Sequence, residues 1–117
     1  MKIKRKPLKI PRTKAFIKQK GLCYYCHFPM WNKQPSEILL KFNFSIKNLV
    51  HFKCTGEHLI AHSEGGKANQ SNIVAACWFC NFKRHQRKKR PTDTQYLKFV
   101  RYRIKSGKWN SGMISEV

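Results

Sequence analysis

Two pairs of cysteines, each spaced as C-x-x-C, constrain the fold of this chain more than any other feature. Cys23 and Cys26 form the first pair, and Cys77 and Cys80 form the second. A C-x-x-C turn presents two thiolates from one knuckle, and two knuckles complete the tetrahedral shell of a structural zinc site. Four thiolates leave no position for water, so the pattern predicts structural Zn²⁺ rather than a catalytic ion. The alternative is a set of reduced thiols packed in the core.

The 50 residues between the two knuckles are long enough to hold a hairpin. Residues 38–46 and 49–55 are both rich in branched and aromatic side chains, a composition typical of strands. We expect these two runs to pair as antiparallel strands. Cys54 has no C-x-x-C partner, so we expect it to be a small buried apolar residue rather than a ligand.

Capping and stop signals predict three helices around this centre. Thr13 is expected to cap a short helix that ends at Gly21. The second helix is expected to run from the second knuckle to about residue 90, where Pro91 stops it. Thr92 is expected to cap the last helix, whose apolar side chains recur at helical spacing: Tyr96, Phe99, Val100 and Ile104.

The charge of the chain predicts a polyanionic partner. Twenty-five Lys and Arg residues face five Asp and Glu residues, which gives a formal net charge of +20. Such a surface is typical of proteins that bind nucleic acid or an anionic membrane, and ribosomal-type RNA binding stays open on charge alone. Residues 1–12 are basic and contain two prolines, and we expect them to form an extended arm.

The chain contains no long apolar run, and its basic N-terminus is not followed by an apolar stretch. These features argue against a transmembrane helix and against a secretory signal. We therefore expect a cytoplasmic protein without a membrane partner, whose reduced thiols serve metals.

Five residues between and just after the cysteine pairs are candidates for phosphodiester hydrolysis: Glu57, His58, Asn72, Asn81 and His85. The reaction needs a base that activates water and a cation that stabilises the charge building on the phosphate. His58 is suited to be the base, because an imidazole titrates close to neutral pH. Glu57 offers hard oxygen ligands for Mg²⁺ or Mn²⁺. Asn81 and His85, four positions apart on the expected helix, face the same way and can share one ion.

Glu57 and His58 are neighbours in the sequence, which creates a geometric difficulty. Neighbouring side chains on a regular strand point to opposite faces of the sheet. Both can face one phosphate only if the chain bends at the end of the strand, and Gly56 makes such a bend easier.

The helix that carries Asn81 and His85 is also crowded with cations. If it lies against a nucleic-acid groove, these cations contact phosphates and give affinity without sequence choice; the alternative is a solvated charged face. The candidates for phosphate contact are Lys83, Arg84, Arg87, Lys88, Lys89 and Arg90. The aromatic residues of the same helix, Trp78, Phe79 and Phe82, are expected to pack in the core.

Three runs of the sequence together resemble the HNH endonuclease family in its four-cysteine branch. They are residues 54–66 (CTGEHLIAHSEGG), 71–74 (SNIV) and 77–81 (CWFCN). The resemblance extends over residues 21 to about 90. It implies an α+β fold, in which a small ββα-metal core stands on a treble-clef zinc scaffold with flanking helices.

By the same resemblance, His58 is the general base, and Glu57 and Asn81 bind the catalytic metal. Asn72 holds the loop that orients the base, although taken alone it could merely cap a helical or turn segment. His85 matches a helical metal ligand that only some branches of the family have.

The chain departs from the family pattern at two positions. Many members have Asp where this chain has Glu57, and the longer side chain shifts the metal. Proline is common where Ala61 stands. The remaining histidines have no partner pattern and are expected to be structural or surface residues, with phosphate contact left open for one of them, His62: they are His27, His51 and His62.

The sequence therefore predicts three regions and one activity. Residues 1–12 form the basic arm, residues 13–91 the HNH zinc-binding nuclease domain, and residues 92–117 a C-terminal helix and tail that pack on the same domain. The predicted protein is an HNH endonuclease that hydrolyses DNA, double-stranded DNA above all, with structural Zn²⁺ and catalytic Mg²⁺ or Mn²⁺. The alternative is a catalytically inactive, zinc-stapled nucleic-acid-binding module. A homodimer is left open.

Overall fold

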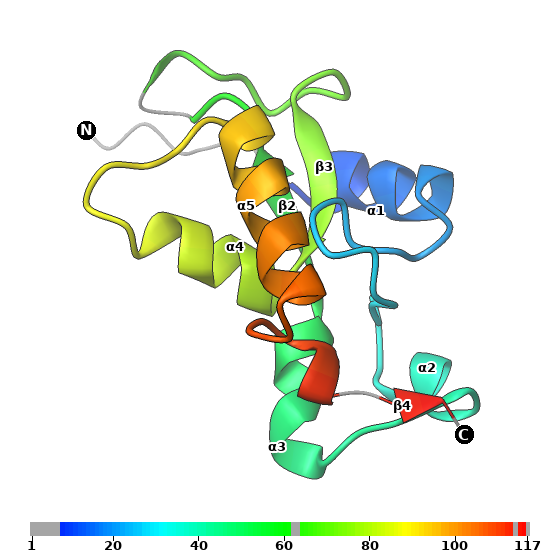
Figure 1. Ribbon diagram of the computed structural model, residues 1–117. Helices are drawn as coiled ribbons and strands as arrows, with labels where there is room; N and C mark the ends of the chain where they lie inside the picture. Colours follow the sequence, from blue (N-terminus) through cyan, green and yellow to red (C-terminus); the bar gives the residue numbers. More distant parts are fainter. Residues whose placement is uncertain (1–7, 62–63, 114, 117) are drawn as a thin grey trace.

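A two-stranded antiparallel sheet and the helix that follows it form the centre of the fold (Figure 1). The computed structural model describes residues 8–61, 64–113 and 115–116. Strand β2 (Cys54–His58) pairs with β3 (Ile73–Cys77), and α4 (Trp78–His85) begins directly after β3. Together these elements make a ββα unit, so the predicted α+β class with a ββα core is confirmed.

Two longer helices pack around this unit. Helix α1 (Lys9–Lys18) lies against β2 and β3, and the Gln19 side chain at its C-terminal end bonds both the N–H and the C=O of Ala75 on β3. Helix α5 (Asp93–Lys105) adds Tyr96 to the core, where its ring meets the ring of Tyr25 edge-on. The buried core thus holds the cysteines together with these aromatic rings.

The predicted start of α5 is confirmed. Thr92 caps the helix through its side-chain oxygen, which accepts a hydrogen bond from the N–H of Gln95, and the Gln95 side chain accepts one from the N–H of Thr92 in return. This reciprocal capping box satisfies two donors that the first turn would leave unpaired. The apolar stripe also faces inward, since Tyr96 and Val100 are fully buried.

The predicted hairpin of residues 38–46 with residues 49–55 is wrong. This region forms short elements instead, and the strand that begins at Cys54 pairs with residues from beyond the next loop. Strand propensity depends strongly on what a run packs against, and a short apolar run cannot be told from a buried helical turn. The elements of this region are α2 (Ser36–Leu39), β1 (Phe42–Asn43), α3 (Ile46–Leu49) and η1 (Val50–Phe52). Strand β1 pairs with β4 (Ser115–Glu116), which follows η3 (Ser111–Met113).

Two predicted helix boundaries are also wrong. Helix α1 begins at Lys9 rather than at Thr13, so residues 9–12 are not an extended arm; residues 1–7 lie outside the described residues. Pro11 is tolerated because the first turn of a helix has no intrahelical acceptor for its N–H groups. Helix α4 ends at His85, several residues before Pro91. Among the described helices, none is both long and apolar enough to cross a bilayer.

Candidate active site

The four cysteines of the two C-x-x-C pairs meet in one buried cluster, Cys23, Cys26, Cys77 and Cys80. Their sulfur atoms all lie within 4.8 Å of one another, and the Sγ atoms of Cys26 and Cys77 are 3.9 Å apart. A tetrahedral zinc shell with Zn–S bonds of about 2.3 Å would place its sulfurs about 3.8 Å apart. The cluster therefore fits a zinc ion, as predicted.

The local backbone explains how the two knuckles form. The first follows a turn with positive φ at Lys20 and Gly21, and an isolated bridge from Leu22 to Pro29 closes it. The second lies at the start of α4, where the Sγ of Cys77 caps the helix by accepting a hydrogen bond from the N–H of Cys80. A knuckle in a turn facing a knuckle in the first turn of a helix is the arrangement expected of a treble clef.

Hydrogen bonds and burial together determine the charge of these sulfurs. Burial raises the pKa of Cys23, but hydrogen bonds from the other three thiols outweigh it and leave that pKa well below the ordinary value. The pKa of Cys77 and that of Cys80 are raised, chiefly by burial. The indole Nε1 of Trp109 also donates to the Sγ of Cys80 at 3.3 Å. A second thiolate in this buried space needs a cation, which a bound zinc ion supplies.

Cys54 lies outside the cluster, although it stands opposite Cys77 in the β2–β3 register. It is 1% exposed, and burial raises the pKa of its thiol to about 12. The expectation of a buried, uncharged residue is confirmed.

One face of β2 meets one face of α4, and three candidate site residues come together there. The Nδ2 of Asn81 donates to the Oγ1 of Thr55 at 3.0 Å, and the Nε2 of His85 lies 3.1 Å from the Oε1 of Glu57. Thr55 and Glu57 are two residues apart on the strand, and Asn81 and His85 are four apart on the helix, so each pair shares a face. Glu57, Asn81 and His85 are thus brought to one place.

Arg84 holds this place together from inside the protein. It is 2% exposed, and its guanidinium donates to the hydroxyl of Tyr25 at 3.1 Å, to the carbonyl of His58 at 3.0 Å and to the carbonyl of Pro91 at 3.1 Å. A further bond reaches the carbonyl of Leu59. The prediction of Arg84 as a phosphate contact is therefore wrong, because its donors are directed to protein groups in the interior.

Arg84 also forms a buried ion pair with Glu57. Its Nη1 is 3.4 Å from the Oε2 of Glu57, whose residue is only 1% exposed. A carboxylate so buried needs compensation by a positive charge and by donors, and Arg84 and His85 approach one oxygen each. Glu57 is thereby held in a single orientation toward α4.

His58 is placed differently from Glu57. Strand β2 stays regular through His58, which pairs with Ile73, so the two neighbours point to opposite faces of the sheet. The bend that Gly56 was expected to allow is absent. Gly56 serves packing instead, since a Cβ there would lie 3.2 Å from the side chain of Leu8 at the start of α1.

Asn72 closes the loop that follows His58. Its Oδ1 accepts from the N–H of Ile60 at 2.8 Å, and its Nδ2 donates to the carbonyls of Ile60 and Lys67, each at 3.0 Å. Asn72 precedes β3 rather than a helical segment, so its side chain does not cap a helix. It fixes the chain two residues beyond the candidate base.

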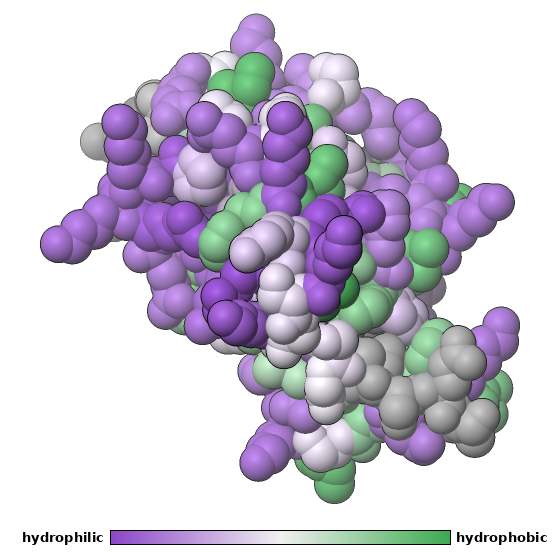
Figure 2. All heavy atoms as spheres, viewed as in Figure 1, coloured by the Kyte–Doolittle hydropathy of each residue, from purple (hydrophilic) through white to green (hydrophobic). Residues whose placement is uncertain are grey.

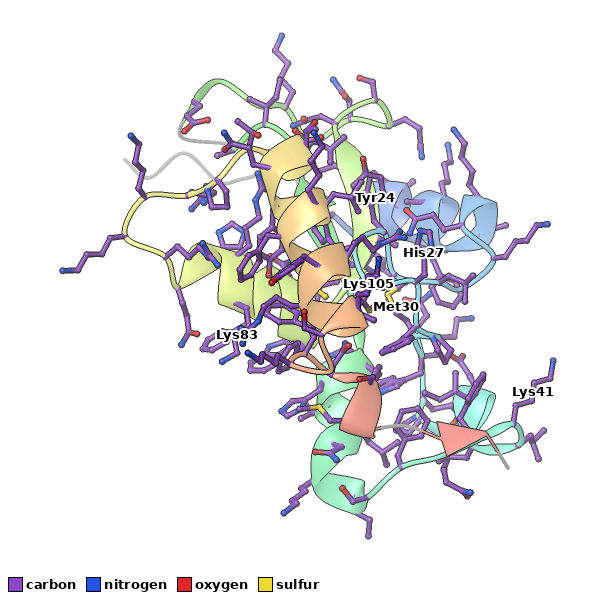
Figure 3. The ribbon with its side chains drawn as sticks, in the orientation of Figure 1. Tyr24, His27, Met30, Lys41, Lys83 and Lys105 are labelled. Atoms are coloured by element: carbon purple, nitrogen blue, oxygen red, sulfur yellow. The ribbon has the colours of Figure 1, made fainter. Side chains whose placement is uncertain are left out.

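The remaining cations of α4 and the turn after it are exposed: Lys83, Arg87, Lys88, Lys89 and Arg90. Figure 3 labels Lys83 on α4, and Figure 2 shows that hydrophilic side chains cover most of the visible face. The guanidinium of Arg87 lies 4.0 Å from the centre of the Phe99 ring. His62 lies outside the described residues.

Sequence reasoning missed Arg84, Tyr25 and Trp109 as supports of the site. The helical spacing of Arg84 was the available signal: Cys80 follows Cys77 by three residues and Arg84 follows Cys80 by four, which places all three on the inner face of the helix. The contacts of Tyr25 and Trp109 with the site join residues far apart in sequence, and no local pattern indicates them.

Comparison with known families agrees with this geometry. A comparison with curated proteins gives no match. Residues 45–87 match the family model described as HNH endonuclease, and this span contains β2, β3 and α4. Such a domain indicates a nuclease or a related activity on nucleic acid. Residues 45–87 are therefore similar to HNH endonuclease domains, and the four-cysteine cluster fits the zinc branch of that family.

Proposed function

We propose that this chain is a metal-dependent endonuclease that hydrolyses phosphodiester bonds in DNA. The observation that carries the proposal is the meeting of Glu57, Asn81 and His85 between β2 and α4, with His58 next along the same strand. We assign the activity to residues 13–91, with residues 92–117 as a supporting helix and tail.

The donor atoms of Glu57, Asn81 and His85 fit a divalent ion. A carboxylate oxygen, an amide oxygen and an imidazole nitrogen suit Mg²⁺ or Mn²⁺, with water and phosphate oxygens filling the remaining positions. The Oε2 of Glu57 is buried and has no hydrogen-bond partner among the described residues, apart from its ion pair with Arg84, so it has capacity for a ligand. When bound, the ion supplies positive charge that stabilises the phosphate and the leaving oxygen.

His58 acts as the general base and takes a proton from the attacking water. In an in-line displacement the attacking and leaving oxygens stand on opposite sides of phosphorus. Glu57 and His58 point to opposite faces of β2, and the bend expected at Gly56 is absent. The proposal therefore places the phosphate at the edge of the strand, between the two faces, rather than on one face of the sheet.

Two residues keep His58 in position. Arg84 donates a hydrogen bond to the carbonyl of His58. Asn72 holds the loop that begins after His58 through hydrogen bonds to the backbone of Ile60. A base whose backbone is fixed on both sides loses little freedom when substrate binds, which favours the reaction.

The exposed cations bind the substrate. The formal charge of +20 and the exposed Lys83, Lys88, Lys89 and Arg90 support contact with the phosphates of double-stranded DNA. Contacts of this kind carry no base information, so we expect low sequence preference and steep weakening of binding with salt.

Plasmid cleavage in Mg²⁺ or Mn²⁺ tests the proposal, with the His58→Ala protein purified in parallel as the control. We expect cutting by the parent protein and its loss in the variant. Equal cutting by both would mean a contaminant or a different base. Binding without cutting by either protein would leave an inactive zinc-stapled nucleic-acid-binding module in place of a nuclease.

A further inference from the structure

Three aromatic rings form a continuous stack along the outer side of α4. The ring of Trp78 lies between two others: its centroid is 5.7 Å from that of His51, at an interplanar angle of 8°, and 4.6 Å from that of Phe82, at 10°. Phe79 is buried as expected, but Phe82 is 43% exposed. The expectation that Phe82 packs in the core is therefore wrong, and the stack ends at a ring open to solvent.

The open end of the stack lies beside the candidate metal site. Side chains on a helix lean toward its N-terminus, so the Phe82 ring covers Trp78 and turns its other face toward the C-terminal end of α4. The next turn carries His85, three residues and about 4.5 Å further along the helix axis. Asn81, adjacent to Phe82 in sequence, contacts β2 at the same level.

One cation stands next to the exposed end of the stack. Lys83 follows Phe82 and is exposed, and its ammonium lies 5.6 Å from the centre of the Phe79 ring, which in turn lies 5.6 Å from the His51 ring. An exposed aromatic face with a lysine beside it suits a flat aromatic ligand attached to an anionic backbone, and a nucleotide has this chemistry.

We propose that the stack of His51, Trp78 and Phe82 is a subsite for one unpaired base of the nucleic-acid substrate. A base inside an intact duplex has both faces covered by its neighbours, so only a flipped, bulged, gapped or single-stranded base can stack on Phe82. The inference rests on the proposed function for its ligand. It adds to that function a preference for DNA with an unpaired base beside the scissile phosphate.

Binding without added Mg²⁺ or Mn²⁺ tests the subsite apart from catalysis. Fluorescence anisotropy would compare three labelled probes: a duplex, a single strand of the same sequence, and that strand with its bases removed at consecutive abasic sites. Tyr102→Ala removes an aromatic side chain that is 69% exposed on α5, and is the matched control for Phe82→Ala.

We expect Phe82→Ala to weaken binding of the single strand about tenfold or more and to change duplex binding little. Phe82→Trp should keep the affinity, and the abasic strand should bind the parent protein and Phe82→Ala alike. Equal losses on duplex and single strand, or equal affinities of Phe82→Ala and Tyr102→Ala for the single strand, would overturn the subsite. Plasmid cleavage by the parent protein is judged separately, so the subsite can fail while the nuclease proposal stands.

Discussion

The guanidinium of Arg84 donates a hydrogen bond to the main-chain carbonyl of His58, at 3.0 Å. The same Nη1 reaches the hydroxyl of Tyr25, which lies within the first cysteine knuckle. The zinc-binding half of the protein and the strand that carries the candidate base are therefore joined through one buried side chain. This contact links the four-cysteine cluster to the proposed hydrolytic site.

Removal of the Arg84 guanidinium should destabilise the protein strongly. Arg84→Ala leaves the carboxylate of Glu57 buried without its cation, a change that costs about 3–5 kcal/mol in comparable cases. Urea unfolding of the zinc-loaded proteins measures this cost. Lys88→Ala, which removes an exposed cation from the turn after α4, is the control and should change stability by less than about 0.5 kcal/mol. Equal stabilities of the two variants would contradict the structural role of Arg84.

Zinc binding should depend on the four clustered cysteines and not on the fifth cysteine, Cys54. We expect the parent protein to bind one zinc ion per chain. Cys77→Ser should lose the ion and Cys54→Ala should keep it, because Cys77 belongs to the cluster and Cys54 does not. Metal analysis by mass spectrometry gives the stoichiometry, and circular dichroism follows the fold. Stripping the zinc with a strong chelator should unfold the chain, since a small core depends on its staple. Loss of zinc from Cys54→Ala as well would contradict the assignment.

Cys54 should make stability sensitive to alkaline pH. Burial raises the pKa of its thiol to about 12, so the folded state keeps the proton while the unfolded thiol releases it near its ordinary pKa of 9.0. The stabilisation is complete below pH 9 and is lost as the pH rises from there toward 12. By pH 10 the loss is about 1.4 kcal/mol. Urea unfolding at pH 8 and pH 10 should show this loss relative to Cys54→Ala, and parallel curves for both proteins would refute it.

Asn72 should matter more for cutting than for binding. Asn72→Ala removes the three hydrogen bonds that close the loop after His58 and leaves backbone groups of Ile60 without them. We expect a stability cost of about 1–3 kcal/mol and a fall in cleavage rate of about 100-fold, with DNA affinity nearly unchanged. Asn69→Ala changes an exposed residue of the same loop and serves as the control. A rate equal to that of the control would show that the loop does not orient the base.

The sequence predicted correctly the features that depend on residues close together in the chain. The C-x-x-C spacing is enough to form a zinc knuckle, and Thr92 and Gln95 alone form the capping box of α5. Predictions failed where a feature depends on contacts between distant parts of the chain. Residues 38–46 have the composition of a strand, but they form helical turns on either side of the two-residue strand β1, and β2 pairs with residues beyond the next loop.

In the candidate site too, features set by local spacing were predicted and features set by tertiary packing were missed. Asn81 and His85 were predicted to share a face because four positions make one helical turn, and both do face β2. The opposite faces of Glu57 and His58 also follow from strand geometry alone. The burial of Arg84 depends on where α4 packs. The basic composition of the run does not separate Arg84 from its exposed neighbours, whereas its position one helical turn after Cys80 does.

Chemical rescue of His58→Gly tests the central claim most directly, because it asks whether an imidazole at this position activates the water. In Mg²⁺ or Mn²⁺, we expect the variant to cut labelled DNA far more slowly than the parent protein, and added imidazole to restore cutting in proportion to its concentration. The same imidazole should not restore cutting in Glu57→Gln. Undiminished cutting by His58→Gly without imidazole, or no cutting by the parent protein in either metal, would contradict the account.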